Sequence, residues 1–456
     1  MSEEKTGSSR RDFLKIAGSF VAGAVVAGAG VSAMQPRAGP SVTQTQTQTQ
    51  MVTSIQTAAG PTAHVWGGGQ NKVWIPILNK FMSYDDVVAE IQAEKKVSIA
   101  NWTYWGLIDS YFTPSLKKYV KDLYGVDIDV EFLGTQAAKG GWVVAVESAL
   151  AAGQSAPFDL MHIEENFFTD AVSKGIAEPF LPSPLVPWAQ FVDSFFLRLP
   201  YGVQFQQHSL ANFTVNTKYV GDWFQSYKDL ADPRLKGKIT LWPSSDNGLW
   251  GWWAVMAQEL GYDYHNPSDM QKTIKWVADN IHPNVLKYTD DEGELGDVLE
   301  KELSWVSAYW CCLGEGYAIT KPELKGAQVL PQFKSAQVNL PGVYWIPKKA
   351  EHPVLAQIAA DWELSAGLQM TDITQWQLAS DVNKSEQLWC MALEGPLGED
   401  YMQYVPDWVN KLGSKGIFEV FPTIEQAKSY PRLDWGYINN VVGDWINDWK
   451  QLTAAP

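Results

Sequence analysis

The chain is poor in cysteine, histidine and basic residues, and each shortage excludes a class of protein. Three cysteines and six histidines occur in 456 residues, and an odd cysteine count gives no disulfide framework. Cys311 and Cys312 are adjacent and cannot pair with each other without strain, so we interpret them and Cys390 as small buried residues, with a bridge to Cys390 left open. Lys and Arg number 35 against 51 Asp and Glu, a net charge of −16, which argues against nucleic acid and anionic lipid as partners.

Catalytic and metal-binding motifs are also absent from the sequence. It contains no Gly-x-Ser-x-Gly elbow and no His-Glu-x-x-His, and Gly67–Gly69 lacks the Lys-Ser/Thr that completes a phosphate loop. Acidic clusters at Glu164-Glu165 and Asp290-Asp291-Glu292 leave a secreted glycoside hydrolase as one alternative. Neighbouring residues on a strand point to opposite faces, so at most one of Glu164 and Glu165 can face a cleft. We therefore expect no enzyme, no cofactor and no metal site.

Aromatic residues, in contrast, are abundant. The chain has 22 Trp, 18 Tyr and 18 Phe, within a composition that is 46% hydrophobic and 19% charged. Such a chain is long enough for two or three domains with full cores. Aromatic side chains fill cores and also line ligand clefts, so the composition favours a globular protein with a small-molecule site.

The first 60 residues read as an export signal followed by a stalk. Ser9–Lys15 (SRRDFLK) matches the twin-arginine pattern, and the apolar run Ile16–Ala33 ends in a possible cleavage site, Val31–Ala33. We assign 1–40 as signal or anchor and 41–60, rich in alternating Thr and Gln, as an extended stalk. The protein is thus expected outside the cytoplasm, and tethered to the membrane if the signal is retained. Cleavage of the signal and glycosylation of the stalk stay open, as does a surface-layer role that the stalk and the acidity suggest.

Strands and helices alternate over 61–212, which indicates a mostly parallel sheet. The strands are expected near Val97–Ala100, Val126–Phe132 and Pro157–Ile163. Two loops then follow strand ends, at Asn101–Trp105 and Glu164–Asn166, and ligands of open α/β sheets bind at such positions.

A second strand–turn–helix unit covers Lys238–Tyr262. The strand Ile239–Trp242 is followed by Ser244–Asn247, four residues of the N-cap type, and then by a helix with one apolar face. Trp250 and Trp252 flank this face near the turn. We expect the cap side chains and free helix N–H groups to face a ligand.

The order of these pieces resembles an extracellular solute-binding protein of an ABC importer, of the spermidine/putrescine-binding type. The resemblance covers about Val97 to Asp381 and rests on ANWTYWG, FDLMHIEENFFTDAVSKGIAEPF, FTVNTKYV, SYKDLADPRLKGKITLWPSS, WVSAYWCC and VYWIPKKAEHPVLAQIAADW. It implies the type II two-lobed fold, with two mostly parallel α/β sheets joined by a two-crossing hinge. Lobe 1 would comprise 61–212 and the return 336–390, and lobe 2 would comprise 213–335. The crossings would lie at Phe213–Asn216 and near Ala336–Val343.

The resemblance also implies a ligand site between the lobes and delivery of the ligand to the permease subunits of an ABC transporter by a monomeric protein. With the strand-end loops, it gives ten predicted ligand residues: Tyr104, Trp105, Glu165, Asn166, Phe167, Asp246, Asn247, Trp250, Trp310 and Tyr344. Two features of the polyamine-type site are missing, because Gly251 stands where a second acid is expected and Leu340-Pro341-Gly342 replaces Trp-x-Asp. An organic cation is ranked ahead of a sugar on this resemblance, and both stay open.

The last segment, 391–456, contains three amphipathic pieces: Tyr401–Leu412, Thr423–Tyr430 and Tyr437–Leu452. Trp445 and Trp449 are four residues apart on one helix face, which predicts packing. We expect these helices to brace the two lobes.

Overall fold

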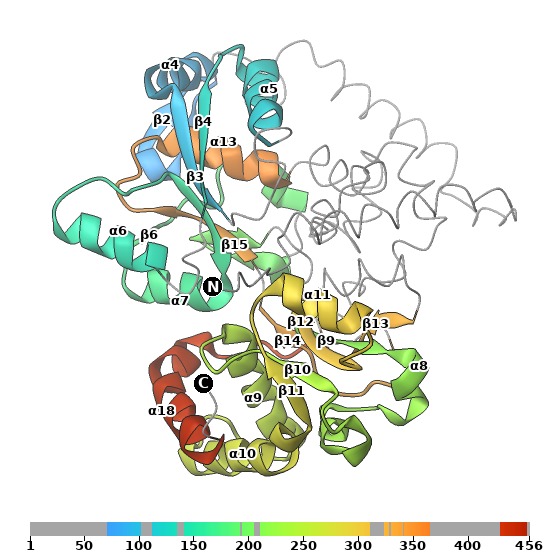
Figure 1. Cartoon of the computed structure of the whole chain (residues 1–456). Helices are drawn as coiled ribbons and strands as arrows, with labels where there is room; N and C mark the ends of the chain where they lie inside the picture. Colours follow the sequence, from blue (N-terminus) through green and yellow to red (C-terminus); the bar gives the residue numbers. More distant parts are fainter. Residues whose placement is uncertain are drawn as a thin grey trace, which may run out of the picture.

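The computed structural model shows two α/β lobes, one above the other in Figure 1. It describes residues 71–101, 112–134, 141–191, 194–204, 210–310, 323–327, 330–340, 342–364 and 429–453.

In lobe 1 the elements are β1 (Val73–Ile75), β2 (Lys80–Met82), α4 (Tyr84–Glu94), β3 (Lys96–Asn101), α5 (Thr113–Tyr124), β4 (Asp129–Gly134), α6 (Gly141–Ala151), β5 (Leu160–Glu164), α7 (Glu165–Ser173), β6 (Ala177–Glu178), β7 (Leu197–Arg198), β8 (Gly202–Gln204), β15 (Gly342–Pro347) and α13 (Pro353–Leu364). In lobe 2 they are β9 (Leu210–Asn216), α8 (Thr217–Val220), β10 (Ile239–Leu241), α9 (Asn247–Glu259), α10 (Pro267–Asn280), β11 (Val285–Tyr288), α11 (Glu292–Glu300), β12 (Val306–Trp310), β13 (Leu324–Gly326), β14 (Val338–Asn339) and α18 (Trp435–Thr453).

Both sheets are mixed, whereas the sequence predicted mostly parallel ones. The lobe 1 sheet has the order β4-β3-β5-β15-β8-β7, and the lobe 2 sheet has the order β11-β10-β12-β9-β13. Strands linked by helical crossovers are parallel, as in β3 with β4 and β5, and β10 with β11 and β12. β9 and β15 enter their sheets from the other lobe instead, and each runs antiparallel to its neighbours.

The chain leaves lobe 1 after β8 and enters the lobe 2 sheet at Leu210, a few residues before the predicted boundary at 212/213. Phe213 is therefore buried in the second core instead of lying in a crossing. The return falls between β14, which pairs with β9, and β15, which pairs with β5. A third passage follows beyond the two predicted, because α13 packs in the lobe 1 core and α18 packs in the lobe 2 core.

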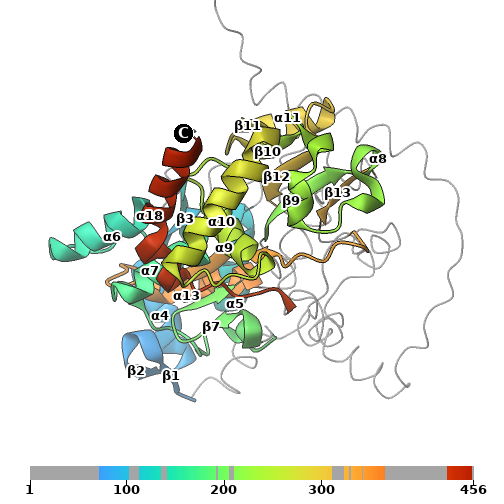
Figure 2. The same ribbon diagram turned by 90° about the horizontal axis from the view of Figure 1, so that it is seen from below.

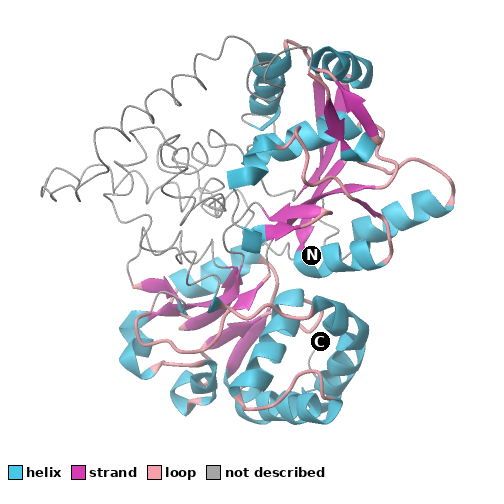
Figure 3. Cartoon of the chain, turned by 180° about the vertical axis from the view of Figure 1, so that it is seen from behind, coloured by secondary structure: helices cyan, strands magenta, loops and turns pink. Residues whose placement is uncertain are grey.

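Helices cover both faces of the lobe 1 sheet (Figure 3). Successive side chains of β15 point to opposite faces of the sheet. Tyr344 and Ile346 belong to the hydrophobic cluster with α4, α5 and α13. Val343 and Trp345 belong to the cluster with α6 and α7. This two-sided burial fixes the register of the strand, because a slip of one residue exchanges the two sets.

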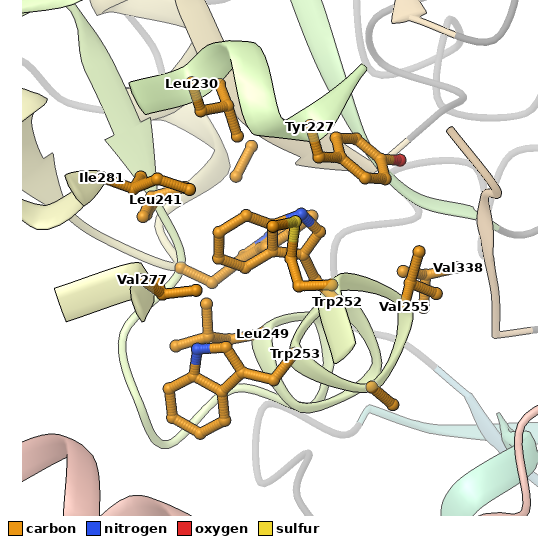
Figure 4. Close-up of a cluster of buried hydrophobic side chains, with 14 of the residues drawn as sticks. Tyr227, Leu230, Leu241, Leu249, Trp252, Trp253, Val255, Val277, Ile281 and Val338 are labelled. Atoms are coloured by element: carbon orange, nitrogen blue, oxygen red, sulfur yellow. The ribbon is translucent and has the colours of Figure 1, made fainter. Parts of the chain in front are cut away.

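The core of lobe 2 is built on indole rings. Trp242, Trp252 and Trp253 are fully buried, and Figure 4 shows the last two among aliphatic side chains from α9, α10 and the strands. Trp252, which was expected to flank the apolar face of the helix near the turn, lies in the core, where its ring centroid is 5.6 Å from that of Phe213. Close packing of these rings makes α9 a rigid support for the turn that precedes it.

The last helix, α18, places Trp445 and Trp449 in the lobe 2 core, as their spacing predicted. It lies against α10 of its own lobe and against α7 of lobe 1 (Figures 1 and 2). The other two predicted C-terminal helices lie outside the described residues, apart from the last two residues of the second. Among the helices that are described, none combines the length and the apolar character that a membrane span requires.

Candidate functional site

The turn before α9 forms as the sequence predicted, and the Asp246 side chain caps the N-terminus of the helix. Asp246 is the N-cap residue, and its Oδ1 accepts a hydrogen bond of 2.7 Å from the backbone N–H of Gly248. Trp250 folds back over the same turn, where its Nε1 donates to the carbonyl of Ser244 at 2.8 Å. The Asp246 carboxylate, which was predicted to contact a ligand, thus stabilises the start of α9.

On the lobe 1 side, Glu165 begins α7 directly after β5. Its carboxylate pairs with the guanidinium of Arg198 from β7, and both side chains are largely buried. Arg432 lies near this pair: partial desolvation and the charge of Arg198 lower the pKa of Arg432, while Glu165 acts in the opposite direction. The second carboxylate predicted for an organic cation therefore already has a guanidinium partner.

Asn166, the second residue of α7, joins the two lobes. Its Oδ1 accepts a hydrogen bond of 3.0 Å from Nδ2 of Asn247, the first residue of α9. Its backbone carbonyl accepts a second one, of 2.8 Å, from Nδ2 of Asn439 on α18. Two of the predicted ligand residues, Asn166 and Asn247, thus lie in direct contact across the lobes. Asn439 was missed, because no local signal links a residue on the last helix to α7.

A buried polar cluster lies behind this junction, at the carboxyl edge of the lobe 1 sheet. His162 Nδ1 is 3.0 Å from Oδ1 of Asn101, and the ring centroids of His162 and Tyr344 are 5.1 Å apart. The Tyr344 hydroxyl accepts a hydrogen bond of 3.4 Å from Nδ2 of Asn101. Burial lowers the pKa of His162 to about 3, so the imidazole is neutral at physiological pH. Tyr344, a predicted ligand residue, is fully buried in this cluster.

The structure describes the remaining predicted ligand residues only in part. Tyr104 and Trp105 lie outside the described residues. Trp310 ends β12, where it pairs with Ala211, and its side chain is likewise outside the description. Phe167 is partly buried against the cluster formed with α6 and α7. The junction that the structure does describe therefore consists of the starts of α7, α9 and α18.

Two residues of the acidic clusters that suggested a hydrolase, Asp291 and Glu165, have structural partners. Asp291 is the N-cap of α11 and accepts a hydrogen bond of 2.9 Å from the backbone N–H of Glu294. Glu164 ends β5 and holds the N-cap position of α7, while Glu165 pairs with Arg198. Within the described residues, no group of three or more His, Cys, Asp or Glu side chains is arranged to hold a metal ion.

No family model and no curated protein matches the sequence. Many solved structures match the fold. An ABC transporter protein from Clostridium perfringens ATCC 13124 is 18% identical, with a TM-score of 0.55, over 78% of this chain and 99% of that one. The spermidine/putrescine substrate-binding protein PotD from Streptococcus pneumoniae is 13% identical, with a TM-score of 0.55, over 79% of this chain and 99% of that one.

A periplasmic thiamin binding protein is also similar, at 13% identity and a TM-score of 0.51, over 78% of this chain and 96% of that one. Proteins with this architecture thus include binders of chemically different solutes. At these identities the likeness concerns the backbone arrangement, and it agrees with the strand orders and the interlobe passages described above. The chain has the two-lobed type II fold of the periplasmic substrate-binding proteins.

Proposed function

We propose that this protein is an extracytoplasmic substrate-binding protein that captures a small solute between its lobes and delivers it to an ABC transporter. The contact between Asn166 and Asn247 is the observation that carries the proposal. It joins the helix after β5 to the helix after β10, so the carboxyl edges of the two sheets meet at one junction. Ligands of open α/β sheets bind at these edges, and closure of two such lobes is a common way to enclose them.

The proposal includes export and tethering. The twin-arginine string Ser9–Lys15 and the following apolar run are the support for export by the twin-arginine route. The permease subunits, a monomeric state and retention of the signal as an anchor are further parts of the proposal. Replacement of Arg10 and Arg11 together by Lys is expected to leave the precursor in the cytoplasm, as measured by cell fractionation. Unchanged export of this variant would contradict the assigned route.

Binding is tested by thermal unfolding of the exported domain with a panel of polyamines, other amines, organic acids and oligosaccharides. A ligand at a hundred times its Kd adds about 2.7 kcal/mol to the free energy of unfolding, which is easily detected. We expect one chemical class to raise Tm in the wild type, and Asn247→Ala to reduce that rise. Asn280→Ala is the matched control, since Asn280 is exposed on α10 and its Nδ2 donates only within its own helix, to the carbonyl of Trp276. Absence of any stabilising solute in the panel would contradict the proposal.

A further inference from the structure

Two helices begin at the junction of the lobes, one from each lobe, and a buried amide lies between them. We propose that the solute carries a carboxylate, and that the side-chain amide of Asn166 receives this carboxylate between the starts of α7 and α9. The inference deepens the proposed function, on which it rests, by naming the chemical class of the solute. It differs from the organic cation that the resemblance ranked first.

The amide of Asn166 is the first observation. The residue is fully buried, and its Oδ1 accepts from Asn247. Its Nδ2, on the other side of the same amide, has no hydrogen-bond partner. A buried donor without an acceptor costs about 1–3 kcal/mol, so an incoming oxygen is favoured at this position. An ammonium group cannot fill the same role, because it offers only donors.

The helix starts are the second observation. α7 makes no hydrogen bond from its N-cap side chain, in contrast to α9, which Asp246 caps. The first N–H groups of a helix lack intrahelical partners and carry a partial positive charge. When the lobes part, the contact between Asn166 and Asn247 breaks, and both helix starts become accessible together with the amide. A carboxylate is the small organic group that suits such a place best.

The charges around the junction are compatible with an anion. Glu165 is neutralised by Arg198, and Arg432 supplies a second guanidinium near the same pair. Two carboxylates oppose an anion, those of Glu164 and Asp246, but Asp246 is hydrogen-bonded to the start of its own helix. Leu433 and Trp435 lie close to α9, since a Cβ added at Gly251 would be 3.2 Å and 3.1 Å from their side chains. Arg432 therefore belongs to the segment that packs on α9 and leads into α18.

A series of compounds of equal length tests the inference directly. Putrescine, 4-aminobutyrate, succinate and 1,4-butanediol share a four-carbon chain and differ only in their end groups. We expect 4-aminobutyrate or succinate to raise the Tm of the wild-type protein and putrescine and butanediol to leave it unchanged. A rise with putrescine or butanediol alone, or with none of the four, overturns the inference.

Introduction of a negative charge at the amide gives a second, independent test. Asn166→Asp keeps an oxygen for Asn247 and replaces the donor by a carboxylate oxygen, so the affinity for the active carboxylate, measured by titration calorimetry, is expected to fall at least tenfold. Asn280→Asp on α10 is the control and is expected to bind normally. Unchanged affinity of the Asn166→Asp protein also overturns the inference. The proposed function is separable: it survives if an amine or a sugar of the wider panel binds, and it fails only if no solute does.

Discussion

The two lobes share a strand–helix plan and both bury indole rings, but lobe 1 also buries several ionisable side chains. Lobe 2 buries three indoles in one hydrophobic cluster, those of Trp242, Trp252 and Trp253. At a similar depth lobe 1 holds ionisable groups in hydrogen bonds, such as Asp361, which accepts from the Tyr119 hydroxyl at 2.7 Å, and His162 beside Asn101. A sheet of this kind can therefore hold a buried polar network beside its aromatic core, as lobe 1 does with Trp345 and Trp362. We therefore expect the stability of lobe 2 to depend most on the volume of its buried side chains. The stability of lobe 1 should depend on pH and on small steric changes.

Loss of an indole from the lobe 2 core is expected to have the largest effect. Trp252→Ala leaves a cavity among well-packed rings and should lower the free energy of unfolding by about 3–5 kcal/mol. Trp250→Ala, two residues earlier on α9, removes a partly buried ring and one hydrogen bond to Ser244, and should cost markedly less. Urea unfolding followed by circular dichroism measures both. Equal losses would show that the two rings contribute alike to stability.

A single methyl group tests the tight packing of lobe 1. A Cβ at Gly342 would lie 2.0 Å from Nε2 of His162 and 2.9 Å from its Cδ2. Gly342→Ala must therefore displace a buried ring or the start of β15, and is expected to cost about 1–3 kcal/mol. Gly443→Ala on α18 is the opposite case, because nothing lies within 4 Å of the added methyl, and a gain of about 0.5–1 kcal/mol is expected in a helix. A neutral Gly342→Ala protein would mean that the His162 cluster is loosely packed.

The contribution of His162 to stability should fall in acid. Burial lowers the pKa of His162 from 6.5 to about 3, so between these values the unfolded chain binds a proton that the folded one does not. Stability is therefore lost as the pH falls below about 6.5, by about 1–2 kcal/mol between pH 7 and pH 5. Burial raises the pKa of Asp361 to about 7, which acts in the opposite sense, since its folded form keeps a proton that the unfolded chain releases.

The contribution of His162 is isolated by comparing the wild type with one variant over that pH range. His162→Gln should lose less free energy of unfolding on acidification than the wild type. Parallel pH profiles for the His162→Gln protein and the wild type would show that this imidazole does titrate in the folded state.

Local patterns predicted the strand–turn–helix unit of lobe 2 closely. The N-cap-type run Ser244–Asn247 does end in the N-cap and first turn of α9, because capping depends on neighbours in the sequence. Whether a polar side chain contacts a ligand or a structural partner could not be predicted in the same way. Glu165 looked like a ligand acid, but its partner Arg198 comes from a strand whose position only the folded sheet defines. Asn439 contacts Asn166 across 273 residues, and no periodicity reports such a distance.

That distant contact gives the smallest and most specific prediction. Asn439→Ala removes one hydrogen bond between α18 and α7, and its expected cost is about 0.5–1.5 kcal/mol. Asn440→Ala, the next residue, removes a bond within α18 to Gly436 and controls for the helix itself. If α18 braces the two lobes, only the Asn439→Ala protein should populate a wider interlobe distance, measured between spin labels on α6 and α10. Identical distance distributions in the two variants would assign α18 to lobe 2 alone, and the Asn166–Asn247 contact would then be the hydrogen bond that holds these helix starts together.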